Sequence, residues 1–194
     1  MPASTAQRST GSRIKCPITI IISLTFAAGV LASEPMAPAP GTPAAGTPAP
    51  SFSGELLGGG TLALESLRGK VVLLNFWAVE CPPCRIEMPE LEKIHRRYSK
   101  QGLRVLGVTE MDPTRDQVIR SVKELGVTYP ILLDPGGRIA TLYGIEAHPT
   151  SFVIDAKGMV RFVNGGYLKG EEKDIEREIR NALAAPRKEV GGKP

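Results

Sequence analysis

The segment that most constrains the fold is a run of seven residues, 71–77, with the sequence Val-Val-Leu-Leu-Asn-Phe-Trp. It is almost continuously apolar and has the length of a strand. A strand with one solvated face would alternate between apolar and polar residues, whereas a continuous run indicates burial on both faces. We therefore expect this segment to be the central strand of a covered sheet.

Helices and strands alternate on either side of this run. Residues 52–57 and 61–64 flank Gly58-Gly59-Gly60 and predict a hairpin. Further strands are predicted at 103–109, 131–133, 150–155 and 159–164. Helices are predicted at 81–99, at 138–143 as a short turn, and at 171–184. Another helix is expected to run to Leu125, with Asp112 as its cap and Pro113 in its first turn. The order predicts an α/β fold with a mixed sheet.

Composition supports a single folded domain and limits the classes of partner. The chain has 194 residues, of which 42% are hydrophobic, and a net charge of +4. Three of the 24 basic side chains and none of the 20 acidic ones lie in residues 1–32. The remainder is nearly neutral, so no charge pattern typical of nucleic-acid binding is left.

The first fifty residues are typical of a targeting segment and a spacer. A basic start, an uncharged run over 18–32 and small residues at its end predict a signal peptide or an N-terminal membrane anchor over 1–32. Residues 33–50 contain six Pro and five Ala, which predicts an extended linker. We expect the folded domain at 51–185, a flexible tail at 186–194, and a periplasmic or other extracytoplasmic location, with the inner membrane as a possible anchor site.

Two of the three cysteines lie where the buried strand turns into a helix. Cys81 and Cys84 are separated by Pro82 and Pro83. At the start of a helix the free N–H groups favour a thiolate over a thiol. Cys84 lies one turn further on the same side, so the two sulfurs can form and reopen a disulfide. The prolines stiffen the loop.

A pair of cysteines at this spacing is also found as half of a zinc site. Such a site needs two more ligands, and the chain offers only His95 and His148, at no recognised zinc spacing. His95 lies in a charged helical stretch, for which we expect a solvated face and no role.

The segment around the cysteines resembles a known family. Residues 75–89 read Asn-Phe-Trp-Ala-Val-Glu-Cys-Pro-Pro-Cys-Arg-Ile-Glu-Met-Pro, and residues 148–155 read His-Pro-Thr-Ser-Phe-Val-Ile-Asp. Together with 67–72 they are similar to the TlpA-like thioredoxins, and the similarity spans about 50–185. The resemblance implies a thioredoxin fold with an N-terminal hairpin, an αβ insertion near 112–133, and a cis Pro149 that faces the disulfide.

The resemblance also implies an activity and partners. TlpA-like proteins are exported, often membrane-tethered thiol–disulfide oxidoreductases. Some serve cytochrome c maturation and others copper-centre assembly. It implies disulfide-bearing exported partners, namely apocytochrome c or copper-site proteins, and a membrane thiol carrier as electron donor. No feature of the chain implies an organic cofactor; the redox group would be the Cys81–Cys84 disulfide itself.

Glu87 can be placed from helical spacing alone. Leu91, Ile94 and Tyr98 form an apolar stripe, and Glu87 lies four residues before Leu91 on the same face. A buried carboxyl group there should have a raised pKa and could exchange a proton with Cys84. The family keeps a glutamate at this position. The alternative is a first-turn Glu that complements the helix dipole.

Three neighbouring residues could tune the site. In cytosolic thioredoxins the position of Asn75 is a buried aspartate, and because an amide cannot titrate, Glu87 is the better candidate for proton transfer. Glu80 replaces the usual aromatic residue and should raise the thiol pKa of Cys81. His148 replaces the usual Val or Thr. A protonated His148 near Cys81 would offset Glu80, and the alternative is an imidazole that points away.

Three functions remain open from the sequence. The first is an exported dithiol reductase, in which Cys81 attacks a partner disulfide, Cys84 resolves the mixed disulfide, and Pro149 helps to align the partner. The second is a disulfide oxidant with the same chemistry in the opposite direction. The third is a Cu(I)-binding protein that uses Cys81, Cys84 and His148. Trp77, the only tryptophan, lies four residues before Cys81 and should report redox changes.

Overall fold

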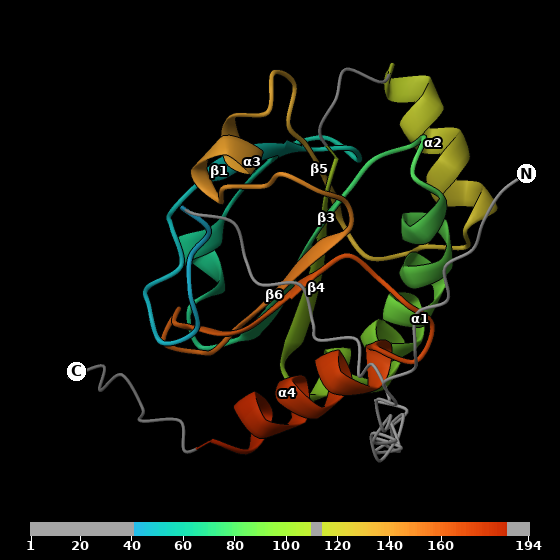
Figure 1. The fold of residues 1–194 in the computed structure, drawn as a ribbon. Helices are drawn as coiled ribbons and strands as arrows, with labels where there is room; N and C mark the ends of the chain where they lie inside the picture. The colour runs from blue at the N-terminus through green and yellow to red at the C-terminus, as the bar shows by residue number, and fades with distance from the viewer. Residues whose placement is uncertain (1–40, 110–113, 186–194) are drawn as a thin grey trace, which may run out of the picture. The chain divides into compact units, whose positions relative to one another are not determined.

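A computed structural model describes residues 41–109 and 114–185, all of which belong to one compact unit, 34–194. A mixed sheet of seven strands forms its centre (Figure 1), in the order β2-β1-β5-β4-β3-β6-β7. The strands are β1 (Ser53–Leu56), β2 (Thr61–Ala63), β3 (Val71–Trp77), β4 (Leu103–Thr109), β5 (Ile131–Leu133), β6 (Thr150–Ile154) and β7 (Val160–Gly165). The helices are α1 (Pro82–Tyr98), α2 (Arg115–Glu124), α3 (Arg138–Leu142) and α4 (Glu172–Ala184), with 3-10 turns at Leu64–Leu67 and Ser99–Gln101.

The central position of β3 follows from its composition. All seven of its residues are buried, with β4 parallel on one side and β6 antiparallel on the other. Leu73 and Trp77 pack into a core with α1, α2 and α4, whereas Leu74 and Phe76 pack with α3 and the N-terminal segment. Helices therefore cover β3 from both faces (Figure 1), which confirms the α/β prediction.

The hairpin and the insertion extend the sheet on the β4 side of β3. Strand β5 pairs parallel with β4, and β1 pairs antiparallel with β5, so the β1–β2 hairpin forms one edge of the sheet. The expected αβ insertion is α2 followed by β5.

The predicted start of α2 is wrong. Thr114, and not Asp112, is the N-cap. Its side chain accepts a hydrogen bond from the backbone N–H of Gln117, and the Gln117 side chain accepts one from the backbone N–H of Thr114. This reciprocal pair satisfies two backbone donors that a helix start leaves free, which is the advantage of Thr114 as a cap. Asp112 and Pro113 lie outside the described residues.

The last part of the predicted linker, 41–50, lies within the described residues, and some of it contacts the domain. The backbone N–H of Gly46 donates to the carbonyl of Val160 at 2.8 Å, and the N–H of Ala49 donates to the carbonyl of Gly158 at 2.9 Å. Ala49 is buried against the core. Residues 46–49 therefore pair with the chain at the start of the edge strand β7 and pack on the domain, because this edge offers unpaired backbone groups.

Four predictions fall wholly or partly outside the described residues. These concern the signal peptide or anchor at 1–32, the first part of the linker, the start of the insertion and the tail at 186–194. Among the helices of the described ranges, none has the length and apolar character to cross a membrane.

Candidate active site

The two cysteines form a disulfide at the start of α1. Cys81 is the N-cap, and the backbone N–H of Cys84 donates to its sulfur at 3.2 Å. Pro82 and Pro83 are the first two residues of the helix, where no intrahelical N–H is required. The sequence therefore fixes the local geometry: the strand ends, the prolines begin a helix, and Cys81 is left at its positive end.

The two sulfurs differ in how far they reach the surface. Cys81 is 8% exposed and Cys84 is 0% exposed. Cys81 lines a surface groove that Cys84 does not line. It is therefore the one that a partner disulfide can reach first.

The groove beside Cys81 has a volume of about 410 Å³ and lies between α1 and α2. Polar and apolar groups share its lining about equally. It contains Glu80, which is exposed, together with Arg85 on α1 and Glu124 on α2. Arg85 and Glu124 form an exposed ion pair of 3.0 Å across the groove. A polypeptide placed in this groove would lie next to the redox-active sulfur.

Glu87 lies on the buried face of α1, as its spacing predicted. Its side chain is 0% exposed. Asn75 Nδ2 donates to Glu87 Oε2 at 2.8 Å, and Ser151 Oγ donates to Glu87 Oε1 at 3.3 Å. Burial raises the pKa of Glu87 to about 8. The hydrogen bonds from Asn75 and Ser151 lower this pKa, whereas the negative charge of Glu171 raises it. Glu87 can therefore bind and release a proton near neutral pH.

Ser151 is a site residue that sequence reasoning missed. It faces Asn75 across the β3–β6 pair, and Asn75 Nδ2 donates to its oxygen at 2.9 Å. The available signal was weak: Asn75 is a polar residue between apolar neighbours, but Ser151 follows Thr150 and does not stand out in its strand. Only the register between β3 and β6 shows that the two polar residues meet.

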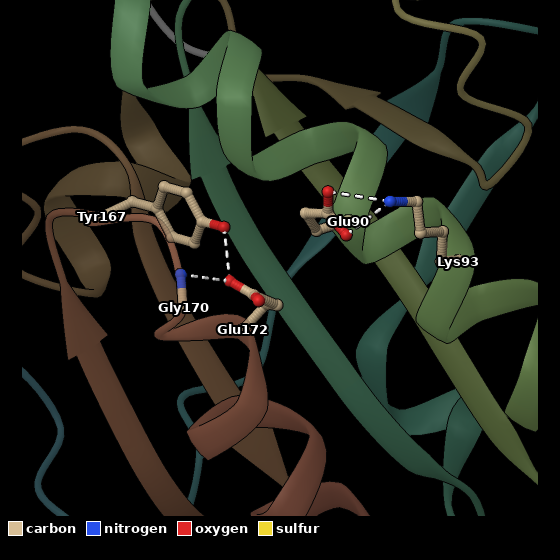
Figure 2. Close-up of polar contacts among 5 residues, drawn as sticks. All are labelled: Glu90, Lys93, Tyr167, Gly170 and Glu172. Carbon is tan, nitrogen blue, oxygen red and sulfur yellow. Dashed lines mark hydrogen bonds and ion pairs between the residues drawn. The ribbon is translucent and has the colours of Figure 1, made fainter.

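The loop after β7 lies on the same side as the first half of α1. Tyr167 donates through its hydroxyl to Glu172 Oε2 at 2.6 Å, and the same oxygen accepts from the backbone N–H of Gly170 at 2.7 Å (Figure 2). Burial, the hydrogen bond to Glu172 and the charge of Glu172 raise the pKa of Tyr167, and the charges of Glu90 and Glu87 add to the effect. These contacts hold the loop in place close to the buried carboxyl group.

Pro149 precedes β6, and its peptide bond with His148 is cis, as the resemblance implied. Thr150 pairs with Phe76, so the register brings Pro149 to the end of β3, where Trp77 leads into the cysteine loop. His148 is half-buried, and burial lowers its pKa. The shift favours the neutral imidazole and therefore counts against a charged His148 as the partner that offsets Glu80.

Trp77 is buried in the same core cluster as Cys81 and Cys84. Its indole packs over Gly107 of β4, where an added Cβ would lie 3.1 Å from Trp77 Nε1. This position makes its fluorescence a suitable probe of changes at the disulfide.

His95 was expected on a solvated face, and the structure shows it half-buried with its ring 6.0 Å from that of Tyr129. In the described part of the chain, no three His, Cys, Asp or Glu side chains cluster so that they could hold a metal ion. Cys81, Cys84 and His148 do not form such a group in this disulfide-bonded state.

The chain is similar in sequence to a known protein family and to named members of the thioredoxin-like and thiol–disulfide oxidoreductase proteins. The family model described as the AhpC/TSA family matches residues 45–163. The chain is 35% identical over 149 residues to the thiol-disulfide oxidoreductase ResA of Halalkalibacterium halodurans, which covers 77% of this chain and 81% of the relative. It is also 35% identical over 131 residues to the thioredoxin-like protein YneN of Bacillus subtilis, with 67% and 75% covered.

The fold comparison agrees with the sequence comparison. A crystal structure from Chlorobium tepidum, assigned as the thiol:disulfide interchange protein DsbE, superposes with a TM-score of 0.69 at 30% identity and covers 73% of this chain and 99% of that one. A disulfide at a helix start, a buried carboxyl group on the same helix and a cis proline before β6 fit these names. The chain belongs to the AhpC/TSA family, and it is a thioredoxin-fold thiol–disulfide oxidoreductase.

Proposed function

We propose that the protein is an exported dithiol reductase that donates electrons to the disulfides of partner proteins. The observation that carries this proposal is the pairing of a reachable sulfur with a buried proton acceptor. Cys81 borders the groove, and Glu87 lies fully buried on the same helix with a pKa of about 8. Such a pair can attack a disulfide at the surface and handle the proton inside.

The reaction starts from the reduced dithiol. Cys81 attacks one sulfur of the partner disulfide as a thiolate, the partner S–S bond breaks, and a mixed disulfide forms while the other partner sulfur leaves as a thiolate. Cys84 gives its proton to Glu87 and attacks the sulfur of Cys81. The second partner sulfur then leaves. Two electrons pass to the partner, which takes up two protons and becomes a dithiol, and the enzyme ends as the Cys81–Cys84 disulfide.

The helix start favours the attacking thiolate. The N–H of Cys84 lies within hydrogen-bond distance of the Cys81 sulfur, and Pro82 and Pro83 keep this turn in a helical conformation. A negative sulfur gains from this donor and from the helix dipole. Pro149 and the adjacent backbone would align the partner chain, in keeping with the family resemblance.

Export and the choice of partners rest on the sequence pattern. The basic and apolar residues of 1–32 support export, with cleavage or retention as an anchor both open. The TlpA-like resemblance supports apocytochrome haem-site cysteines or copper-site cysteines as targets. It also supports a membrane thiol carrier that reduces the Cys81–Cys84 disulfide after each turnover.

The reduction potential of the cysteine pair tests the direction of the reaction. The full-length protein is equilibrated with glutathione or dithiothreitol buffers, and Trp77 fluorescence reports the reduced fraction. A potential near that of thioredoxin, about −270 mV or lower, is expected of a reductase. A value near about −120 mV would identify an oxidant and overturn the proposal. The Cys84→Ser variant is the control, because it should show no reversible intramolecular transition.

A further inference from the structure

The buried carboxyl group of Glu87 is part of a closed ring of hydrogen bonds with two other side chains. Asn75 Nδ2 donates to Glu87 Oε2 at 2.8 Å and to Ser151 Oγ at 2.9 Å, and Ser151 Oγ donates to Glu87 Oε1 at 3.3 Å. All three residues are fully or almost fully buried. They come from three elements, β3, β6 and α1, and meet on the α1 face of the sheet.

A group that gains and loses a proton inside a protein needs partners in both states, because an unpaired buried polar atom is costly. The charged carboxylate accepts hydrogen bonds from two donors, Asn75 Nδ2 and Ser151 Oγ. The neutral acid needs an acceptor for its O–H. Ser151 can supply one, since a hydroxyl both donates and accepts. Asn75 can supply another after a half-turn of its amide, because its Oδ1 accepts no hydrogen bond from the described residues.

We propose that Ser151 is a positioning residue for Glu87 which, together with Asn75, keeps the carboxyl group in place and hydrogen-bonded in both its charged and its neutral state. This inference rests on the proposed function, in which Glu87 takes the proton of Cys84. It adds the reason why a carboxyl group this deeply buried can be reused at every turnover. Leu or Val at position 151 would leave the charged state without one of its two donors.

Other ionisable groups that act on Glu87 come from three further segments. Glu171 before α4 raises the pKa of Glu87. Tyr129 before β5 and Tyr167 after β7 have pKa values raised in part by the charge of Glu87, so both stay neutral as Glu87 titrates. On α1 itself, Cys84 is buried one turn away. Of these groups, Glu171 is the one whose charge acts on the pKa of Glu87 in the disulfide-bonded protein.

The test is the titration of Glu87 in the full-length, disulfide-bonded protein, followed by NMR of ¹³C-labelled Glu side-chain carboxyl groups and assigned with Glu87→Gln. In Ser151→Ala the midpoint is expected to rise by about 0.5 to 1 pH unit, because one donor to the carboxylate is lost. Asn75→Ala should raise it further, since its bond is shorter. Ser151→Thr, which keeps the hydroxyl, should return the midpoint to that of the unchanged protein.

The matched control removes a buried hydroxyl that does not contact Glu87. Thr109 lies on β4, the other neighbour of β3, and Thr109→Val should leave the Glu87 midpoint in place. An unchanged midpoint in a folded Ser151→Ala protein would overturn the proposal. If Asn75→Ala does not fold, the Ser151 pair of variants is sufficient.

The same variants link the ring to catalysis. In the reduced protein, the pH at which the exchange rate with a small disulfide rises should move upward by the same amount in Ser151→Ala, because the base form of Glu87 is needed. If neither the unchanged protein nor any of the variants exchanges with the small disulfide, the proposed function is rejected. The NMR midpoint would still decide the role of Ser151, since it is read in the oxidised state.

Discussion

The backbone N–H of Cys84 lies 3.2 Å from the sulfur of Cys81 and donates to it, whereas Cys84 itself is closed off from solvent. The two cysteine side chains are chemically identical, but their surroundings differ in hydrogen bonding and in exposure. The sulfur of Cys81 accepts a hydrogen bond from a backbone N–H, and Cys81 is partly exposed. Cys84 is fully buried.

Alkylation of the reduced protein should therefore be selective. Iodoacetamide at pH 7 is expected to modify Cys81 at least tenfold faster than Cys84, because the helix start favours its thiolate and only Cys81 borders the groove. Peptide mapping by mass spectrometry measures the two rates. Cys84→Ser should react at a similar rate to the unchanged protein and Cys81→Ser far more slowly. Equal rates at both positions would contradict the assignment of Cys81 as nucleophile.

Substitution of Glu87 should change how stability depends on pH. The folded-state pKa of Glu87 is raised by burial from 4.5 to about 8, so its contribution to stability is fully present below about pH 4.5 and is lost as pH rises through about 8. The loss is on the order of 5 kcal/mol. Glu87→Gln cannot lose a proton and should be the more stable protein at pH 9. Urea unfolding of both proteins at pH 5 and pH 9 measures the difference. If the difference in unfolding free energy between the two proteins is the same at both pH values, the raised pKa of Glu87 is refuted.

Glu92 should show the opposite dependence. Although burial acts to raise its pKa, hydrogen bonds from Thr128 and Arg96 lower it. Thr128 donates to this carboxylate through its backbone N–H at 2.8 Å and its hydroxyl at 2.7 Å. The resulting stability is present above about pH 4.5 and is lost as pH falls through the lowered pKa.

Glu92→Gln is therefore expected to lose about 1 kcal/mol of unfolding free energy at pH 7 and little or nothing near pH 3. Unfolding by urea at the two pH values measures this. Lys93→Gln, on the exposed side of the same helix, is the control and should be close to neutral at both. A loss for Glu92→Gln that is the same at pH 3 would point to packing rather than charge.

Gly107 should be needed for the placement of Trp77. A Cβ at this position would lie 2.6 Å from Ile131 Cδ1 and 3.1 Å from Trp77 Nε1. Gly107→Ala is expected to cost about 1 to 3 kcal/mol by overpacking and to shift the Trp77 emission. Gly58→Ala, where an added Cβ meets nothing within 4 Å, should change neither. Thermal unfolding and fluorescence spectra distinguish the two variants.

His148 should affect the nucleophile only in acid. Burial lowers its pKa below 6.5, so the imidazole is neutral at pH 7.5 and can stabilise the Cys81 thiolate as a cation only at lower pH. His148→Ala is expected to leave the alkylation rate of Cys81 unchanged at pH 7.5 and to reduce it below pH 6. A large effect at pH 7.5 would show that the imidazole acts there by some means other than its charge.

The order of the elements and the chemistry of the cysteine pair were predictable from the sequence. The apolar run of β3, the prolines at the start of α1 and the spacing of Glu87 from Leu91 are local patterns, and each reflects a backbone period or a helix end. They need no knowledge of distant residues. The start of α2 is local too, but several polar residues there can cap a helix, and the hydrogen bonds select Thr114.

The tertiary structure alone decided which distant residues meet. Ser151 contacts Glu87 because β6 pairs with β3 in a register that places it beside Asn75, and a shift by one residue would turn it to the other face. Residues 46–49 pack against the start of β7 because that strand has a free edge, although the composition of 33–50 is typical of a linker. The groove beside Cys81 exists because α2 packs near α1. Each depends on pairing between segments far apart in the chain, which composition and periodicity do not encode.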